Sequence, residues 1–156
     1  MEKKYESQTI AGTRGLFTFN FFCESIITAL HTLLHMLEHA EIPAPEELSK
    51  VPKTLSDFGM ALQEDYDQKA VNLCRIKEDI LRFYKAAFKA NDKLVPLLPT
   101  ENNEIFYYYL LYTEGVNLLF ANFMYSLCSD FPENEDMTPA IAEIRQAFLA
   151  VSESYE

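Results

Sequence analysis

The amino-acid sequence predicts an all-α fold, a single-domain four-helix bundle with up-down topology. Apolar residues recur at helical spacing in four long segments, and no segment shows the sustained alternation of a half-buried strand. Proline or glycine separates each segment from the next. Short connections between such helices favour antiparallel neighbours. We therefore expect a flexible N-terminal arm over residues 1–15 and a helical domain over residues 16–156.

The composition is that of a folded acidic protein. At 156 residues, 49% of them hydrophobic, the chain is long enough to form one domain with a substantial core. The formal net charge of −11 argues against nucleic acid or an anionic membrane as the main partner. The same charge favours a basic protein partner.

Cysteine usage and the N-terminus favour a cytoplasmic protein. The three cysteines are widely spaced and form no C-x-x-C pair: Cys23, Cys74 and Cys128. They are expected to be reduced thiols. The first residues mix charges of both signs, so we expect no signal peptide. The apolar run from Leu16 is interrupted by Asn20 and Glu24, so we expect no membrane span.

The first segment, from about residue 16 to residue 41, reads as an amphipathic helix. At about 100° per residue its apolar positions share one broad face. These positions are Phe19, Phe22, Cys23, Ile26, Leu30, Leu33, Leu37 and Ala40. The opposite face is polar and carries all three histidines, although Phe17 and Phe21 interrupt it. The histidines are therefore expected outside the core.

The second segment, from about residue 54 to residue 90, keeps its apolar face in phase throughout. The face consists of Leu55, Leu62, Tyr66, Ala70, Leu73, Ile76, Ile80, Tyr84, Ala87 and Phe88. An unbroken phase over this length predicts one long helix, with Gly59 loosening its start.

The third segment, from residue 102 to about residue 129, is apolar on almost every side. Such a helix is either central in the bundle or has a second partner. Glu114 falls on the apolar side, where a carboxylate is costly unless it is paired. We consider it a candidate ligand, acid or base. The other interpretation is that it pairs with a basic residue or a tyrosine hydroxyl, or emerges at a partner interface.

The last segment begins with Thr138 as the predicted N-cap and Pro139 at the first helical position. Its apolar stripe consists of Ile141, Ile144, Phe148, Val151 and Tyr155. This is the fourth predicted helix.

The histidines supply the one candidate for metal chemistry. His31, His35 and His39 follow one another at intervals of four residues on the first helix. Two histidines at this spacing can bind one Zn²⁺ or Fe²⁺ ion. Glu38 and Glu114 would complete the ligand set. The competing interpretation is a solvated helix face that binds no cofactor.

Two short matches to known enzymes lack their structural context. His35-Met-Leu-Glu38-His39 is similar to the H-x-x-E-H order of inverted zinc proteases, which are mixed α/β domains, whereas no strand is expected here. His31-Thr-Leu is similar to the start of the phosphate-accepting segment of histidine phosphotransfer domains, but the following lysine and glycine are missing. The sequence has no G-x-S-x-G and no glycine-rich phosphate loop.

These observations favour a small acidic cytoplasmic protein that acts through protein–protein interaction, as an adaptor, inhibitor or chaperone-type module without catalysis. Three features present more apolar surface than four helices cover: the apolar third helix, the linker Leu94-Val-Pro-Leu-Leu98 and the exposed aromatics of the first helix. We therefore expect a homodimer or a heteromeric partner, with the third helix or the linker at the contact. The alternative is a zinc- or iron-binding helical bundle with hydrolase or oxidoreductase activity at the histidine stripe.

Overall fold

The computed structural model describes residues 8–131 and 138–153, and this part of the chain is nearly all helical. The all-α prediction is confirmed. The five α-helices of the described residues are α1 (Arg14–His39), α2 (Lys50–Asp67), α3 (Leu73–Leu94), α4 (Asn103–Cys128) and α5 (Thr138–Glu153). Two short 3-10 helices, η2 (Glu46–Ser49) and η3 (Val95–Leu97), lie in the connections after α1 and α3.

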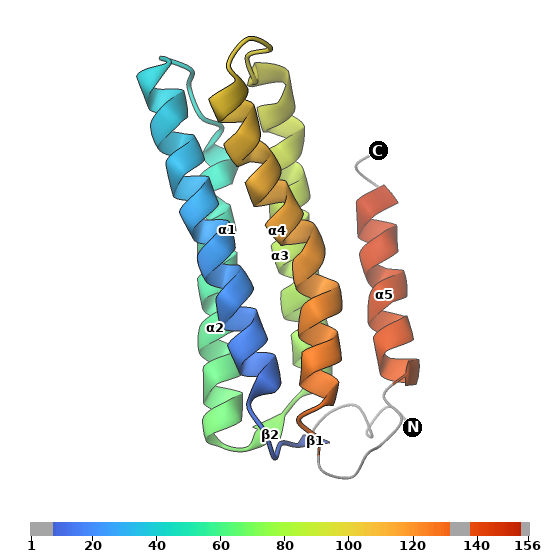
Figure 1. Ribbon diagram of the computed structural model, residues 1–156. Helices are drawn as coiled ribbons and strands as arrows, with labels where there is room; N and C mark the ends of the chain where they lie inside the picture. The colour runs from blue at the N-terminus through green and yellow to red at the C-terminus, as the bar shows by residue number, and fades with distance from the viewer. Residues whose placement is uncertain (1–7, 132–137, 154–156) are drawn as a thin grey trace.

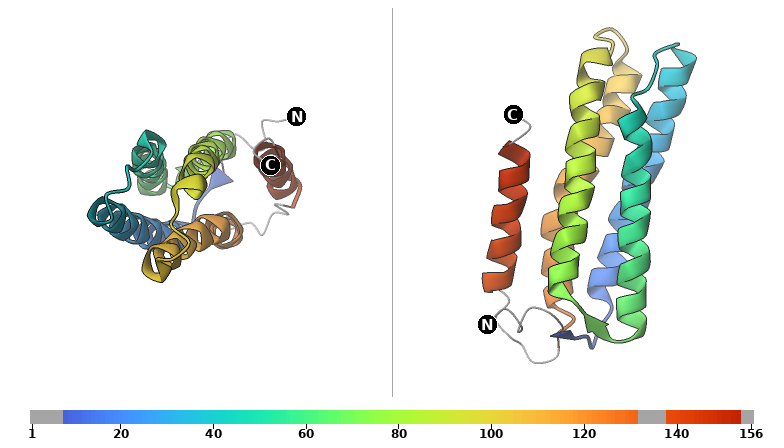
Figure 2. Two further views of the ribbon diagram at one scale, coloured as in Figure 1. Left: turned by 90° about the horizontal axis from the view of Figure 1, so that it is seen from above. Right: turned by 180° about the vertical axis from the view of Figure 1, so that it is seen from behind.

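Four of the helices lie side by side, and the chain reverses direction between consecutive helices (Figure 1). The most extensive contact joins α1 to α4, and the next joins α2 to α3. The fifth helix, α5, lies outside this group against α3, as the views from above and behind show (Figure 2). The sequence predicted four helices, so the count was wrong by one.

The extra helix arises because the predicted helix over residues 54–90 is two helices. α2 ends at Asp67, Lys69 has a φ of 60°, and α3 begins after Asn72. The Asn72 side chain caps α3 by accepting a hydrogen bond from the amide of Arg75 at 3.0 Å. The helical spacing of apolar residues continues across this break, because Tyr66 and Leu73 are seven residues apart, about two helical turns, and both face the core. The apolar pattern of the sequence therefore shows no sign of the break.

The helices α1 and α4 begin and end within two residues of the first and third predicted segments. Asn102 caps α4 by accepting hydrogen bonds from the amides of Glu104 and Ile105, both at 3.1 Å. The start of α5 at Thr138 also agrees, whereas the capping side chain predicted there lies outside the described residues. Gly59 does not loosen a helix start, because it lies inside α2 and a Cβ there would stand 3.2 Å from the Phe19 ring.

Two aromatic clusters hold the helices together. Phe19 of α1 packs against Phe58 of α2 and Phe123 of α4, with ring centroids 4.6 and 5.7 Å away. Phe148 attaches α5, because its ring lies 4.6 Å from that of Tyr84 on α3 and 5.7 Å from that of Phe120 on α4. An ion pair between Lys77 and Glu143, at 2.8 Å, adds a second link between α3 and α5.

The start of α1 is fixed by a residue from the end of α4. Asp130 is 1% exposed, and its carboxylate accepts hydrogen bonds from the amides of Arg14 and Gly15, both at 2.7 Å. The hydroxyl of Tyr66 at the end of α2 donates to the same carboxylate. Thr13, at the N-cap position, makes no side-chain cap. A negative charge at a helix N-terminus is favourable, so Asp130 serves as a long-range cap.

Part of the predicted N-terminal arm belongs to this junction. Gln8–Thr9 forms the strand β1, which pairs antiparallel with β2 (Ala70–Val71) in the α2–α3 connection. Ile10 is buried, and its amide donates to the carbonyl of Lys69 at 3.0 Å. Residues 1–7 of the arm lie outside the described residues. The division at residue 15 stays a prediction.

Candidate functional site

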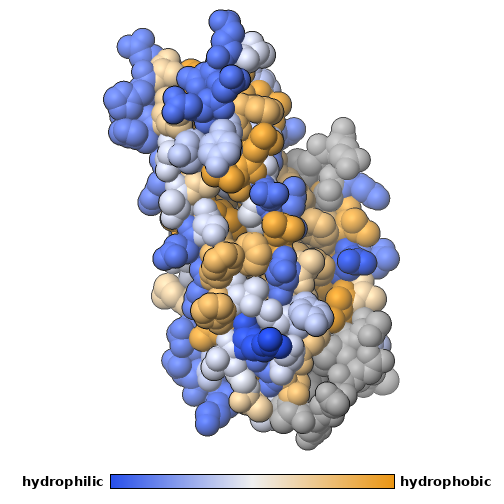
Figure 3. All heavy atoms as spheres, in the orientation of Figure 1, coloured by the Kyte–Doolittle hydropathy of each residue, from blue (hydrophilic) through white to orange (hydrophobic). Residues whose placement is uncertain are grey.

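The outward sides of α1 and α4 form one face, called here the α1/α4 face, that carries much of the exposed apolar surface. Its large apolar residues are Phe17, Phe21, Tyr107, Leu110, Leu111, Leu118 and Tyr125. Figure 3 shows apolar residues over these two helices, interspersed with polar ones. Several large apolar side chains exposed on one face are a candidate for a site of interaction.

The composition of α4 explains why this face is apolar. Its inner side is buried in the core at Ile105, Tyr112, Leu119 and Phe123, and its flank packs on α1. Because the helix is apolar on almost every side, its outer positions are apolar as well. The prediction that this helix is central or has a second partner fits this arrangement. In η3, Val95 also remains exposed.

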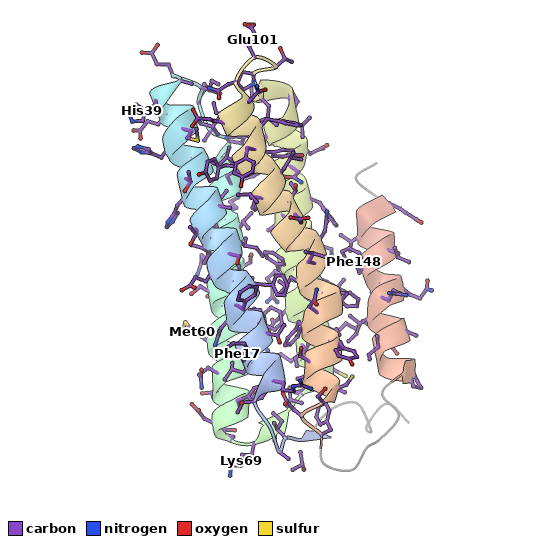
Figure 4. All side chains as sticks on the ribbon, viewed as in Figure 1. Phe17, His39, Met60, Lys69, Glu101 and Phe148 are labelled. Carbon is purple, nitrogen blue, oxygen red and sulfur yellow. The ribbon has the colours of Figure 1, made fainter. Side chains whose placement is uncertain are left out.

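The end of the face nearest the strands is a patch formed by Phe17, Phe21 and Tyr125, called here the terminal patch. Phe17 is 73% exposed and Tyr125 is 77% exposed (Figure 4 labels Phe17). The two helices meet directly beside them, because the hydroxyl of Thr18 donates to that of Ser126 at 2.8 Å. Large aromatic side chains that lie in water at a helix–helix junction are candidates for burial by a partner.

A groove of about 460 Å³ lies further along the same face, between α1 and α4. It is lined by Phe22, Glu24, Ser25, Thr28, Ala29, Tyr108, Leu111, Glu114, Gly115 and Leu118. The two helices are close here, since a Cβ on Gly115 would stand 2.8 Å from the side chain of Ile26. Small residues therefore form the floor of the groove, and large apolar residues form its walls.

Both charged residues of the groove are glutamates. Glu24 and Glu114 are exposed, and neither forms an ion pair with any residue that the structure describes. Glu114 lies among apolar residues, as its place in the sequence indicated. The free-energy cost of burying a carboxylate does not arise for Glu114, because the apolar residues around it are themselves at the surface.

The basic residues near the start of α3 are already paired. Arg75 donates to Asp79 at 2.5 Å and also bonds Asp65, which links α3 to α2. Arg82 donates to the other oxygen of Asp79 at 3.0 Å. These pairs lie on α2 and α3, outside the groove lining.

The histidine stripe lies where the sequence predicted, on the exposed side of α1. His31, His35 and His39 are all exposed, and the rings of His35 and His39 meet edge to face at 4.5 Å. His31 and His35 follow Phe17 by 14 and 18 residues, about four and five helical turns, so the stripe continues the line of the terminal patch.

The structure does not assemble the predicted metal ligands. Within residues 8–131 and 138–153, no group of three or more His, Cys, Asp or Glu side chains is placed to hold a metal ion. Glu38 is exposed beside the histidines, whereas Glu114 lines a groove that contains no histidine. The reason is positional, because the stripe points outward and Glu114 lies beside Ser25 and Thr28 rather than beside the histidines.

The three cysteines are free thiols in different surroundings. Burial raises the pKa of the Cys23 thiol to about 12, and it also raises the pKa of Cys128. Cys74, in the first turn of α3, is exposed. A thiol with a raised pKa is a poor nucleophile, so Cys23 and Cys128 act as packing residues.

One helix has the length and composition of a membrane span. Among the described residues α1 alone meets both criteria. Its inner side, including Phe19, Ile26 and Leu30, is fully buried against the other helices. The prediction that this segment does not span a membrane stays a prediction.

Comparison of the chain with protein-family models, with curated proteins and with solved structures finds no match. The function is therefore inferred from the α1/α4 face. The sequence shows Phe17 and Phe21 as interruptions of the polar side of the first helix, and this observation already indicated the exposed aromatic residues of the terminal patch. Sequence reasoning did not anticipate that Glu24 and Glu114 line the same groove, because the register of two helices separated by α2 and α3 has no sequence signature.

Proposed function

We propose that this protein is a non-catalytic protein–protein interaction module of the adaptor, inhibitor or chaperone type, and that the α1/α4 face is its contact surface. The observation that carries the proposal is the exposure of seven large apolar side chains along two adjacent helices. Burial of apolar surface contributes roughly 25 cal/mol per Å², so a partner that covers this face gains a substantial favourable term.

Self-association through the terminal patch is the form in which we propose that the protein exists. Phe17, Phe21 and Tyr125 supply an aromatic cluster, and aromatic residues are enriched where interfaces bury most surface. In a two-fold symmetric pair the patch of one protomer would face the same patch of its partner. The other partner we propose is a basic protein, which the net charge of −11 would attract.

The proposal includes a location and a topology. Three free cysteines fit a reducing compartment, so we propose that the protein is cytoplasmic. We also propose that α1 to α4 form an up-down four-helix bundle and that α5 is an addition to it. The position of α5, which packs on α3 outside the group formed by the other four helices, supports this division.

Sedimentation equilibrium over a range of concentrations tests the proposed function. We expect the wild-type chain to sediment as a dimer and a Phe17→Glu, Phe21→Glu variant to sediment as a monomer. Met60→Glu is the matched control, because Met60 is 69% exposed on α2 and its replacement should leave the dimer intact. A wild-type monomer at the highest concentration would contradict self-association through the patch.

The zinc- or iron-binding alternative has no comparable support. Its ligands are not assembled in the described residues, and the histidines lie on the same outward side as the terminal patch. Hydrolase or oxidoreductase activity at the stripe is therefore not proposed.

A further inference from the structure

We propose that the groove between α1 and α4 binds an amphipathic helix of another protein. An apolar side chain of that helix would occupy the floor of the groove, and its basic side chains would lie beside Glu24 and Glu114. This inference rests on the proposed function, since it specifies the partner of the same face. Three observations support it: the shape of the groove, its negative charge, and the repulsion between glutamates that would arise if a second copy of the chain covered it.

The shape suits a helix that offers apolar anchors. The buried small residues Ala29 and Gly115 lie at the bottom of the groove, and the small residue Ser25 is exposed beside them. Large walls stand at both ends, with Phe22 and Leu118 toward the strands and Tyr108 and Leu111 toward the opposite end. An amphipathic helix places apolar side chains at i, i+3, i+4 and i+7 along one side, which is how helices occupy apolar grooves.

A second hollow on α4 extends the site. It is lined by Tyr107, Leu110, Thr113 and Asn117, and it shares Leu111, Glu114 and Leu118 with the groove. These three shared residues form a ridge with a hollow on either side. A bound helix thus has two places for apolar anchors, with Glu114 between them.

The negative charge of the groove favours a partner helix with positive charge. Glu24 and Glu114 are the charged residues of the groove lining, and they have no ion-pair partner among the described residues. Lysine or arginine on the flank of a bound helix would pair with them at the edge of an apolar contact. Such charges contribute to specificity and to the rate of association more than to affinity.

A second copy of the chain fits the groove poorly. In a two-fold pair the same surface meets itself, so Glu24 and Glu114 of one protomer would face the same two glutamates. Like charges brought together at an interface are unfavourable. The terminal patch of Phe17, Phe21 and Tyr125 contains no charged residue, although it adjoins the groove where the ring of Phe21 contacts that of Phe22.

Titration with a designed peptide tests the inference. The probe is a synthetic helix of leucine and lysine, about four turns long, with leucine along one side, and its glutamate-for-lysine counterpart is the comparison. We expect the leucine–lysine peptide to bind the full chain and the leucine–glutamate peptide not to bind. Glu24→Gln with Glu114→Gln should weaken binding about tenfold, which corresponds to about 1.4 kcal/mol.

The matched control removes the same charge elsewhere. Glu64 on α2 and Glu78 on α3 are exposed, so Glu64→Gln with Glu78→Gln changes the net charge equally and should leave binding within about twofold. Equal weakening by both double variants would show attraction to the net charge alone and would overturn the inference. Amide shifts that map the peptide to another face, or binding to lipid vesicles in place of the peptide, would also overturn it.

The outcome is distinguishable from that of the test of the proposed function. Sedimentation of the same samples without peptide reports self-association through the terminal patch. Peptide binding by a monomer would reject the dimer and keep the groove, whereas a dimer that does not bind the peptide would reject the groove and keep the dimer.

Discussion

The hydroxyl of Tyr84 on α3 accepts a hydrogen bond from the amide of Phe120 on α4 at 2.9 Å. The same hydroxyl donates to the carbonyl of Val116 at 2.7 Å. In an uninterrupted α-helix that amide and that carbonyl pair with each other. Tyr84 is therefore inserted into the hydrogen-bond ladder of α4, which is one of the recognised causes of a bend in a helix. Its ring also contacts Phe148, so one residue joins three helices.

Two tyrosine-to-phenylalanine substitutions should have different effects on stability. Tyr84→Phe removes two buried hydrogen bonds and should lower the free energy of unfolding by about 1–2 kcal/mol. Tyr112 is fully buried, but its hydroxyl has no partner among the described residues. Tyr112→Phe should therefore be neutral or stabilising by up to about 1 kcal/mol. Urea denaturation of both variants measures the difference, and equal losses would contradict the assigned hydrogen bonds.

Replacement of Asp130 should be among the most damaging single changes. Asp130→Ala leaves the amides of Arg14 and Gly15 and the Tyr66 hydroxyl without their acceptor, so we expect a loss of about 2–4 kcal/mol. Asp130→Asn keeps one acceptor oxygen and should lose less. Asp57→Ala, at an exposed ion pair with Lys53, is the control and should cost less than about 0.5 kcal/mol. Thermal unfolding followed by circular dichroism ranks the three variants.

The histidine stripe should be dispensable for folding. Replacement of His31, His35 and His39 together by glutamine removes exposed side chains and opens no cavity, so the melting temperature should stay nearly unchanged. A chelator should likewise leave the wild-type melt unaltered. A large loss of stability in the triple variant, matched by the chelator on wild type, would restore the metal-binding alternative, because binding free energy at a structural metal site is folding free energy.

The cysteines should differ in their rates of alkylation. At mildly alkaline pH we expect Cys74 to react with iodoacetamide at least about tenfold faster than Cys23, since Cys74 is exposed and burial raises the pKa of Cys23 to about 12. Peptide mapping by mass spectrometry gives both rates. In concentrated urea the two rates should converge, and a difference that persists there would show that burial is not its cause.

Local patterns in the sequence predicted the helices, but not their partners. Helical spacing located α1. Asn72 caps α3, but no helix start was predicted there because Tyr66 and Leu73 keep the apolar phase across the break. The histidines were correctly placed in a polar stripe. Such local signals depend on residues within about two turns of one another.

The contacts missed by sequence reasoning join residues far apart in the chain. Asp130 caps a helix that begins 116 positions earlier, and nothing in the sequence around it indicates that role. Glu114 was correctly placed on an apolar side of its helix, but that side is at the surface because the apolar pattern of α4 continues there. The groove depends on the register between α1 and α4, which the packing of Gly115 against Ile26 sets and no periodicity encodes.

The register of α1 against α4 also has a consequence for the order of events during synthesis. α2 and α3 are joined by the short connection over residues 68–72, whereas the bonds from Arg14 and Gly15 to Asp130 join residues that are 116 and 115 positions apart. Closing long loops costs more entropy, and distant contacts slow folding. A nascent chain on the ribosome that lacks α4 has no groove to offer, and neither does a fragment containing α1 alone. The partner therefore meets a binding surface only after α4 has been synthesised and has packed against α1.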